Sequence, residues 1–228
     1  MKRKKIDKFQ EEIGISFRNP DLLSHALIHS SYANERKMTK ERNNERLEFL
    51  GDAVLELVTS TYLYQTYEKE PEGKLTKLRA SLVCEPTLAM CARDISLGSY
   101  LLLSKGEGMT GGRERDSILS DAFEAVIGAI YLDQGLDAAR QFIEVHLLKD
   151  VENKVLFFDA KTYLQEIIQG EGGEPLSYVL VKEEGPDHQK EFTVEARLGN
   201  KVIGKGTGRS KKSAQQHAAY EALKQYKK

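Results

Sequence analysis

Residues 44–57 (NERLEFLGDAVLEL) constrain the fold more than any other stretch of this sequence. At 100° per residue, Glu45, Glu48 and Asp52 fall within about 60° of one another on one side of a helix. The opposite side carries the residues that we expect in a core: Leu47, Leu50, Val54, Leu57 and Val58. Like charges at this spacing destabilise a helix by roughly 0.2–0.5 kcal/mol per pair, and by more when they are desolvated. The stretch therefore predicts either a cation held against a buried helix or a helix with a solvated acidic face.

A second acidic pair lies on an apolar helix predicted over residues 118–132. Asp121 and Glu124 are three residues apart and share a face of this helix, which is otherwise almost entirely apolar. Pairing the two acidic faces would create a pocket of four or five carboxylates, and a hard cation such as Mg²⁺ prefers such oxygen ligands. The alternative is that these two acids form salt bridges with nearby cations: Lys105, Arg113 and Arg115.

No other motif in the sequence predicts a competing catalytic site. His25 and His29 are four residues apart on a predicted helix, but nothing completes a set of transition-metal ligands, so we interpret them as core or loop histidines. The glycines of residues 106–112 follow no strand and precede no Lys-Ser/Thr pair, which argues against a phosphate-binding loop. We therefore expect residues 105–115 to be a surface loop and the protein to use no nucleotide cofactor.

The composition predicts a soluble globular protein, with 40% hydrophobic and 30% charged residues. No apolar run approaches the roughly 20 residues of a membrane span, so we expect no membrane partner. Cys84 and Cys91 are seven residues apart in a helical pattern, or about 10 Å along the axis, which is too far for a disulfide. Reduced thiols predict a cytoplasmic location.

The pattern of the chain changes near residues 151–160. Before this point every segment has helical spacing, which predicts an all-α domain. After it the order is α-β-β-β-α, with the elements expected at 162–169, 177–183, 190–198, 201–207 and 211–224. We therefore predict domains over residues 1–150 and 159–228, joined by a linker over 151–158.

Charge is distributed unevenly between these two parts. Residues 159–228 contain 12 Lys+Arg and 10 Asp+Glu, a net charge of +2, against 22 and 25, a net charge of −3, in residues 1–158. Lys211 and Lys212 follow a good N-cap residue, Ser210, and oppose the dipole of the last predicted helix. A bound phosphate would explain these cations, although an exposed basic helix terminus is the alternative. His188 lies in a predicted turn that could enter the minor groove of RNA.

The motifs described above resemble those of the ribonuclease III family. Residues 44–52 (NERLEFLGD) are similar to its defining motif. The motif includes Gly51, and a glycine in the middle of a helix is less stable than alanine by about 1 kcal/mol, so we expect a close neighbour at this position. The similarity continues through Glu72-Gly73 and Asp116-Ser117-Ile118-Leu119 to Tyr131-Leu132-Asp133. From Asp159 to Ala214 the chain resembles a double-stranded-RNA-binding domain.

The resemblance implies an all-α endonuclease domain followed by a small α+β RNA-binding domain. It implies hydrolysis of double-stranded RNA with Mg²⁺, which Mn²⁺ can replace, to give 5′-phosphate and 3′-hydroxyl ends with short 3′ overhangs. The implied substrates are precursor ribosomal RNA and other structured RNAs, including messenger RNA. A catalytically silent RNA-binding scaffold is the alternative, and the loss of a ligand acid would have favoured it.

The resemblance also implies roles for individual residues. The implied metal ligands, which are also catalytic, are Glu48, Asp52, Asp121 and Glu124. Glu45 and Glu72 match two further catalytic acids that line the same valley. Phe49 matches an aromatic residue that inserts into the partner subunit of a homodimer.

In the C-terminal part the resemblance implies five contacts with RNA: Gln165, Glu166, His188, Lys211 and Lys212. Gln215 is a departure, because many such domains outside bacteria carry a further basic residue at this position. We therefore expect weaker phosphate binding and a smaller salt dependence.

Overall fold

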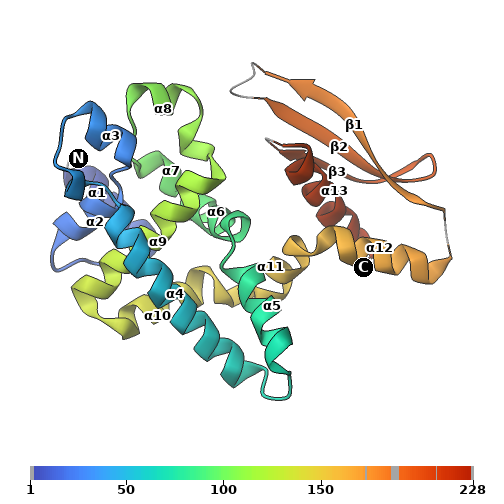
Figure 1. Cartoon of the computed structure of the whole chain (residues 1–228), viewed down its shortest axis with the longest axis horizontal. Helices are drawn as coiled ribbons and strands as arrows, with labels where there is room; N and C mark the ends of the chain where they lie inside the picture. The colour runs from blue at the N-terminus through green and yellow to red at the C-terminus, as the bar shows by residue number, and fades with distance from the viewer. Residues whose placement is uncertain (1–2, 173, 186–189, 209, 227–228) are drawn as a thin grey trace. The chain divides into compact units, whose positions relative to one another are not determined.

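The computed structural model of the chain describes residues 3–172, 174–185, 190–208 and 210–226. It separates into an N-terminal unit, Met1–Val151, and a C-terminal unit, Glu152–Lys228. The first unit is helical, and the second contains a three-stranded sheet covered by helices (Figure 1). Within the described ranges, no helix is both long enough and apolar enough to cross a membrane.

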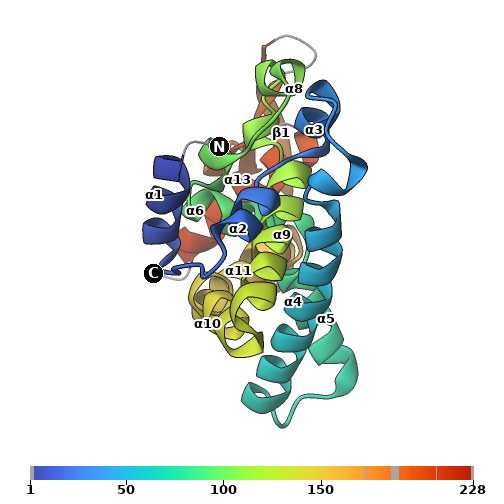
Figure 2. The ribbon, with the colours of Figure 1, turned by 90° about the vertical axis from the view of Figure 1, so that its left-hand side faces the viewer.

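The N-terminal unit is built around one buried helix, α9, with α2, α4, α6 and α10 packed against it (Figure 2). Nearly every side of α9 is apolar, so it can be covered from all directions. The helices of this unit are α1 (Arg3–Ile13), α2 (Pro20–Ala26), α3 (Ser30–Glu35), α4 (Glu45–Thr66), α5 (Glu72–Leu82), α6 (Glu85–Asp94), α7 (Leu97–Tyr100), α8 (Lys105–Met109), α9 (Asp116–Gln134) and α10 (Leu136–His146). Short 3₁₀ helices lie at Lys40–Arg42, Gly112–Glu114 and Leu148–Asp150.

The expectation of a surface loop at residues 105–115 is wrong, because this segment forms α8 and a 3₁₀ turn. The Oγ atom of Ser104 accepts a hydrogen bond from the backbone N–H of Glu107 at 3.1 Å and so caps α8. The Nη1 atom of Arg113 donates to the carbonyl oxygens of Gly98 and Leu101, both at 2.8 Å. These side-chain contacts order a segment that its glycine content predicts to be irregular.

Helix α4 has three distinct faces, which corrects the expectation for two of its leucines. Leu47, Val54 and Val58 are buried as expected, but Leu50 is only partly buried and Leu57 is 55% exposed. Phe49 is 80% exposed and lies two turns before Leu57, so the two share a side of the helix. The row of acids lies between this exposed apolar face and the buried one.

The C-terminal unit contains an antiparallel sheet in the order β1-β2-β3, with helices α12 and α13 packed on one another. Its elements are α11 (Val151–Phe158), α12 (Ala160–Glu171), β1 (Leu176–Glu184), β2 (Glu191–Leu198), β3 (Lys201–Gly208) and α13 (Lys211–Tyr226). A Cβ atom at Gly206 would lie 2.2 Å from the backbone nitrogen of Ala218, so α13 lies directly against β3. Alanines on α13 permit this close packing.

Residues 151–158 form helix α11, which corrects the expectation that they only link two domains. Leu156 is part of the core of the C-terminal unit. The ring of Phe157 meets those of His217 and Tyr220 edge-on, at 5.1 and 5.4 Å between centroids. The Nε2 atom of Gln216 donates to the carbonyl oxygen of Phe157 at 2.6 Å. Helix α11 is therefore packed on α13 as part of the C-terminal unit.

Candidate functional site

Helices α4 and α9 touch backbone to backbone at two glycines. A Cβ atom at Gly51 would lie 1.8 Å from the carbonyl oxygen of Glu124, and one at Gly128 would lie 2.2 Å from the carbonyl oxygen of Leu47. Any side chain at either position would therefore force the helices apart. This contact confirms that Gly51 is required by a close neighbour, and it identifies that neighbour as α9.

The glycine contact brings the two acidic pairs together. Glu48 and Asp52 flank Gly51 on α4, while Glu124 lies directly opposite on α9. Burial, followed by the charges of Asp52, Glu48 and Asp121, raises the pKa of Glu124 to about 8. Burial and the same kind of repulsion, chiefly from Asp121, raise the pKa of Glu48 to about 7. The predicted pairing of the two faces is therefore present in the structure.

Burial is also the main cause of the raised pKa of the other two acids of the set. Burial raises the pKa of Asp121, although a hydrogen bond from Ser120 and the charge of His29 act in the opposite direction. Burial, followed by repulsion from Glu56, raises the pKa of Asp52. All four carboxyl groups therefore lie where negative charge is disfavoured, as expected for a site that lacks a cation.

Two of the three cations considered as alternative partners, Arg113 and Arg115, bind other groups. Arg113 is bound to backbone carbonyls, as described above, and the Nη1 atom of Arg115 pairs with Oε1 of Glu107 at 2.5 Å. Within the described residues, none of the four acids forms an ion pair with Lys or Arg. The side chains as they stand do not place three His, Cys, Asp or Glu groups close enough to hold an ion, again among described residues only. The chemistry of the four acids fits Mg²⁺, because they are desolvated carboxylates with no cation from the described part of the chain beside them to neutralise their charge. Binding requires their side chains to turn toward one another.

His29 lies near this acidic set, which the sequence alone did not indicate. It is the N-cap residue of α3, and its Nδ1 atom accepts a hydrogen bond from the backbone N–H of Ser31 at 3.2 Å. Burial lowers the pKa of His29, while Glu107, Asp121 and Glu45 act to raise it. With Nδ1 occupied as an acceptor, the neutral ring carries its proton on Nε2. The spacing of His25 and His29 gave no signal for this role, because the acids come from distant segments.

The two supporting acids lie in different places. Glu45 is the first residue of α4 and its charge contributes to the raised pKa of Glu48. Glu72 is in the first turn of α5, where its Oε1 atom accepts a hydrogen bond from the hydroxyl of Thr76 at 2.7 Å. Roughly 20 Å of helix separates Asp52 from the end of α4 at Thr66, and α5 begins beyond that end. The structure therefore does not bring Glu72 to the other acids within one chain.

The raised pKa values predict how stability depends on pH when no metal is bound. Between about pH 4.5 and pH 8 the folded chain holds protons on Glu48 and Glu124 that the unfolded chain has released. Their stabilising contribution is therefore present below about pH 4.5 and is lost as the pH rises through 7 and 8. Both groups are partly exposed, so we expect about 1–2 kcal/mol over this range after solvent screening.

Urea unfolding in EDTA at pH 5.5, 7 and 8.5 measures this dependence. His29 acts in the opposite sense because its pKa is lowered, so the comparison needs a variant that removes only the two acids whose pKa is raised furthest. The double variant Glu48→Gln/Glu124→Gln retains His29 and should lose most of the decrease in stability between pH 5.5 and 8.5. Equal pH dependence in the two proteins would contradict the assignment.

The candidate RNA contacts of the C-terminal unit lie on two packed helices. Gln165 and Glu166 are exposed on α12, and Lys211 and Lys212 are exposed in the first turn of α13. The Oγ atom of Ser210 accepts a hydrogen bond from the backbone N–H of Ser213 at 3.1 Å, which confirms the predicted N-cap. His188 lies outside the described residues.

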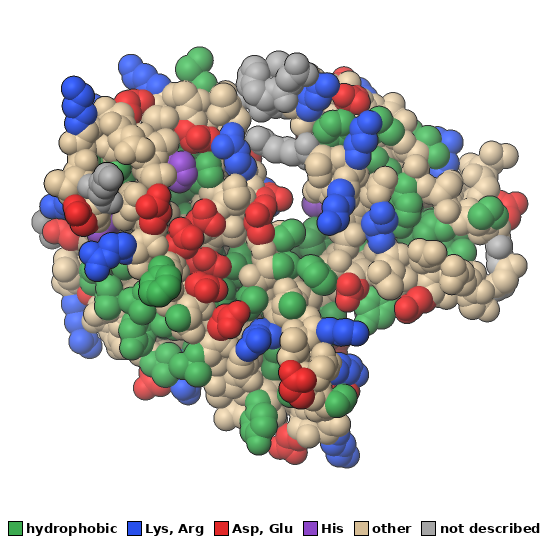
Figure 3. Space-filling view, viewed as in Figure 1, with side chains coloured by type: hydrophobic (Ala, Val, Ile, Leu, Met, Phe, Trp, Pro, Cys, Tyr) green, Lys and Arg blue, Asp and Glu red, His purple; other side chains and the backbone are tan. Residues whose placement is uncertain are grey.

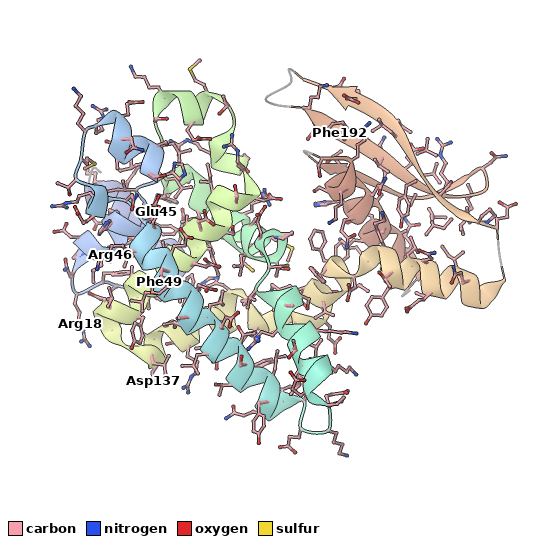
Figure 4. The ribbon with its side chains drawn as sticks, in the orientation of Figure 1. Arg18, Glu45, Arg46, Phe49, Asp137 and Phe192 are labelled. Atoms are coloured by element: carbon pink, nitrogen blue, oxygen red, sulfur yellow. The ribbon has the colours of Figure 1, made fainter. Side chains whose placement is uncertain are left out.

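An aromatic ring lies beneath one of these lysines. The Nζ atom of Lys211 is 5.8 Å from the centroid of the Phe192 ring, which is on β2 (Figure 4). A cation at this distance from a ring face is attracted by the ring quadrupole. The first turn of α13 therefore presents two ammonium groups at the N-terminus of a helix, an arrangement that suits a phosphate.

Comparisons with known proteins agree with this arrangement. Residues 19–151 match the family described as Ribonuclease-III-like, and residues 160–226 match the double-stranded RNA binding motif. The chain is 49% identical to Ribonuclease 3 of Geobacillus kaustophilus over 224 residues. This segment covers 97% of this chain and 91% of the relative. The chain is 51% identical over 222 residues to Ribonuclease 3 of Pelotomaculum thermopropionicum, which covers 96% and 92% respectively.

Solved structures show the same similarity for the N-terminal unit. The nuclease domain of ribonuclease III from Campylobacter jejuni has a TM-score of 0.58 and 45% identity, over 67% of this chain and 95% of that one. A second structure of that domain has a TM-score of 0.57 and 46% identity, over 62% and 97%. It is described as showing structural flexibility in a region involved in dimer formation.

Proposed function

The chain belongs to the ribonuclease III family of double-stranded-RNA endoribonucleases, and we propose that its four clustered carboxylates bind Mg²⁺ for this reaction. These carboxylates are Glu48, Asp52, Asp121 and Glu124. The observation that supports the proposal is that all four are desolvated and mutually repelling, and that none of them has a protein cation as a partner among the described residues. Mn²⁺ is a suitable replacement because it also prefers oxygen ligands.

Each part of the chain has a defined task in this proposal. Bound Mg²⁺ lowers the pKa of a water molecule and neutralises charge on a phosphate oxygen. The glycine contact between α4 and α9 fixes the spacing of the acids, and the surrounding core lowers the local dielectric. Glu45 and Glu72 are proposed as supporting acids, and the products as 5′-phosphate and 3′-hydroxyl ends with short overhangs. Precursor ribosomal RNA and other structured RNAs are the proposed substrates, with a cytoplasmic location.

A direct assay separates this function from its alternatives. We expect the protein to cut a perfect RNA duplex in Mg²⁺, to bind it without cutting in EDTA, and to leave single-stranded RNA intact. Binding without cleavage in Mg²⁺ would favour the silent scaffold. Hydrolysis of mononucleotides without duplex cleavage would instead indicate a small-phosphate hydrolase.

We also propose that the chain forms a homodimer through the exposed face of α4. Figure 3 shows green apolar side chains beside red acidic ones on the N-terminal unit. Leu57 on α4, Leu132 at the end of α9 and Val145 on α10 are each more than half exposed, and these three helices pack on one another. A second copy covering Phe49 and its neighbours would bury this surface, with the acids at its rim.

Phe49→Ala tests the dimer. An aromatic residue at the centre of an interface contributes about 2–4 kcal/mol, so we expect the dissociation constant of the dimer to rise roughly 30- to 1,000-fold. Sedimentation velocity over a range of concentrations measures this change. Met109→Ala is the matched control, because Met109 is 77% exposed but lies on α8. Dimers of equal strength in the two variants would refute the role of Phe49.

A further inference from the structure

A lysine of α12 lies close to the second turn of α13. The Nζ atom of Lys161 donates a hydrogen bond to the Oε1 atom of Gln215 at 2.6 Å. The same Nζ atom lies 4.9 Å from the centroid of the Tyr178 ring on β1. Lys161 is only half-buried, so its ammonium group is held by two neighbours while it keeps access to solvent.

Neither neighbour neutralises the charge of Lys161. The amide of Gln215 is uncharged, and the ring of Tyr178 supplies only a quadrupole. Among the described residues, no carboxylate forms an ion pair with Lys161, whereas Lys182 and Lys224 pair with Glu184 and Glu221. A lysine that is ordered and partly desolvated, but has no anion beside it, can bind an anion from outside the protein.

The position of this charge relates it to the other lysines of the unit. Gln215 follows Lys211 by four residues, so both lie on the same side of α13, about 6 Å apart along the axis. The ammonium group that Gln215 holds therefore lies about one helical turn beyond Lys211. Lys211, Lys212 and Lys161 together present three ammonium groups, two from one helix and one from its neighbour.

We propose that Lys161 is a third phosphate contact of the C-terminal unit, an inference that rests on the proposed binding of double-stranded RNA. Gln215 and Tyr178 are positioning residues, which hold the ammonium group without neutralising it. A polyanion with regularly spaced phosphates suits three cations from two helices better than a single small anion does. Gln215, which by itself predicts weaker phosphate binding, thus holds a cation supplied by another helix.

The salt dependence of RNA binding tests this role. Each phosphate contact contributes about −0.9 to the slope of log Kobs against log[salt] for a B-form duplex, and we expect a change of similar size for RNA. In full-length protein with EDTA, Lys161→Met should make the slope less negative by roughly 1. It should also weaken binding several-fold at low salt, while Lys161→Arg restores both. Lys182→Met is the matched control, since Lys182 already pairs with Glu184 at 2.7 Å, and its slope should equal that of the wild type.

The outcomes distinguish this inference from the function on which it rests. An unchanged slope in Lys161→Met, with wild-type binding of the duplex, overturns the role of Lys161 alone. A wild-type chain that does not bind the duplex overturns the proposed function as well. If Lys161→Met lowers the melting temperature, the slope of Lys161→Gln decides: a slope less negative by roughly 1 supports the contact, and a wild-type slope refutes it.

Discussion

Glu124→Gln is expected to abolish cleavage of double-stranded RNA in Mg²⁺ while the variant still binds the duplex. Glu124 is the acid whose pKa is raised furthest, and its backbone forms the contact between α4 and α9. Glutamine keeps the shape of the side chain but removes the charge that the cation requires. A catalytic metal site contributes several kcal/mol, so we expect cleavage to slow by about 10³-fold or more. Single-turnover cleavage of a labelled duplex, together with binding in EDTA, measures both properties.

Glu56→Gln is the matched control for this prediction. Glu56 lies on the same acidic side of α4 but points to solvent, 4.0 Å from the guanidinium group of Arg79. The resemblance does not require an acid at this position, so we expect its cleavage rate to stay within about threefold of the wild type. Cleavage by Glu124→Gln at the rate of Glu56→Gln would show that the metal site has been assigned to the wrong residues.

Gly51→Ala is expected to destabilise the N-terminal unit and to slow cleavage, although helix propensity alone predicts the opposite. Alanine in a helix is favoured over glycine by about 1 kcal/mol. The added Cβ atom, however, would lie 1.8 Å from the carbonyl oxygen of Glu124, and backbone cannot move aside cheaply. Overpacking of this kind costs about 1–3 kcal/mol and displaces Glu48 and Asp52 from the acids of α9. We expect the melting temperature to fall by roughly 2–10 °C.

Gly73→Ala is expected to change the stability of the same unit in the opposite direction. A Cβ atom at Gly73, in the first turn of α5, would meet nothing within 4 Å. Propensity should then decide, and the variant should be as stable as the wild type or more stable by up to about 1 kcal/mol. Thermal unfolding followed by circular dichroism compares the two. A Gly51→Ala variant as stable as Gly73→Ala would mean that the helices do not touch at these glycines.

The sequence was sufficient to predict the acids and their pairing, because each pair follows a simple helical spacing. Glu48 and Asp52 share one face of α4, and Asp121 and Glu124 share one face of α9. Gly51 also gave a signal, since a mid-helix glycine needs a reason. Its partner Gly128 could not be predicted, because that contact depends on how two distant helices cross.

The remaining differences have the same physical origin. Leu57 has a periodicity typical of a core residue, but α4 has two apolar faces and only one is covered within the chain. Residues 151–158 lack the polar composition typical of a linker. They form α11, which is stabilised by contacts with α13, a helix distant in the sequence. His29 lies near the acidic set only because the fold brings distant segments together. Local patterns predict elements and faces, whereas tertiary contacts decide which faces meet.

The most direct test of the metal site is an anomalous difference map from crystals of the full chain soaked in Mn²⁺. We expect a peak among the carboxylates of Glu48, Asp52, Asp121 and Glu124, with oxygen atoms as its ligands. The same soak of Glu124→Gln crystals should show a weaker peak or none. A well-ordered site without a peak in the wild type, or a peak bound by other residues, would contradict the account.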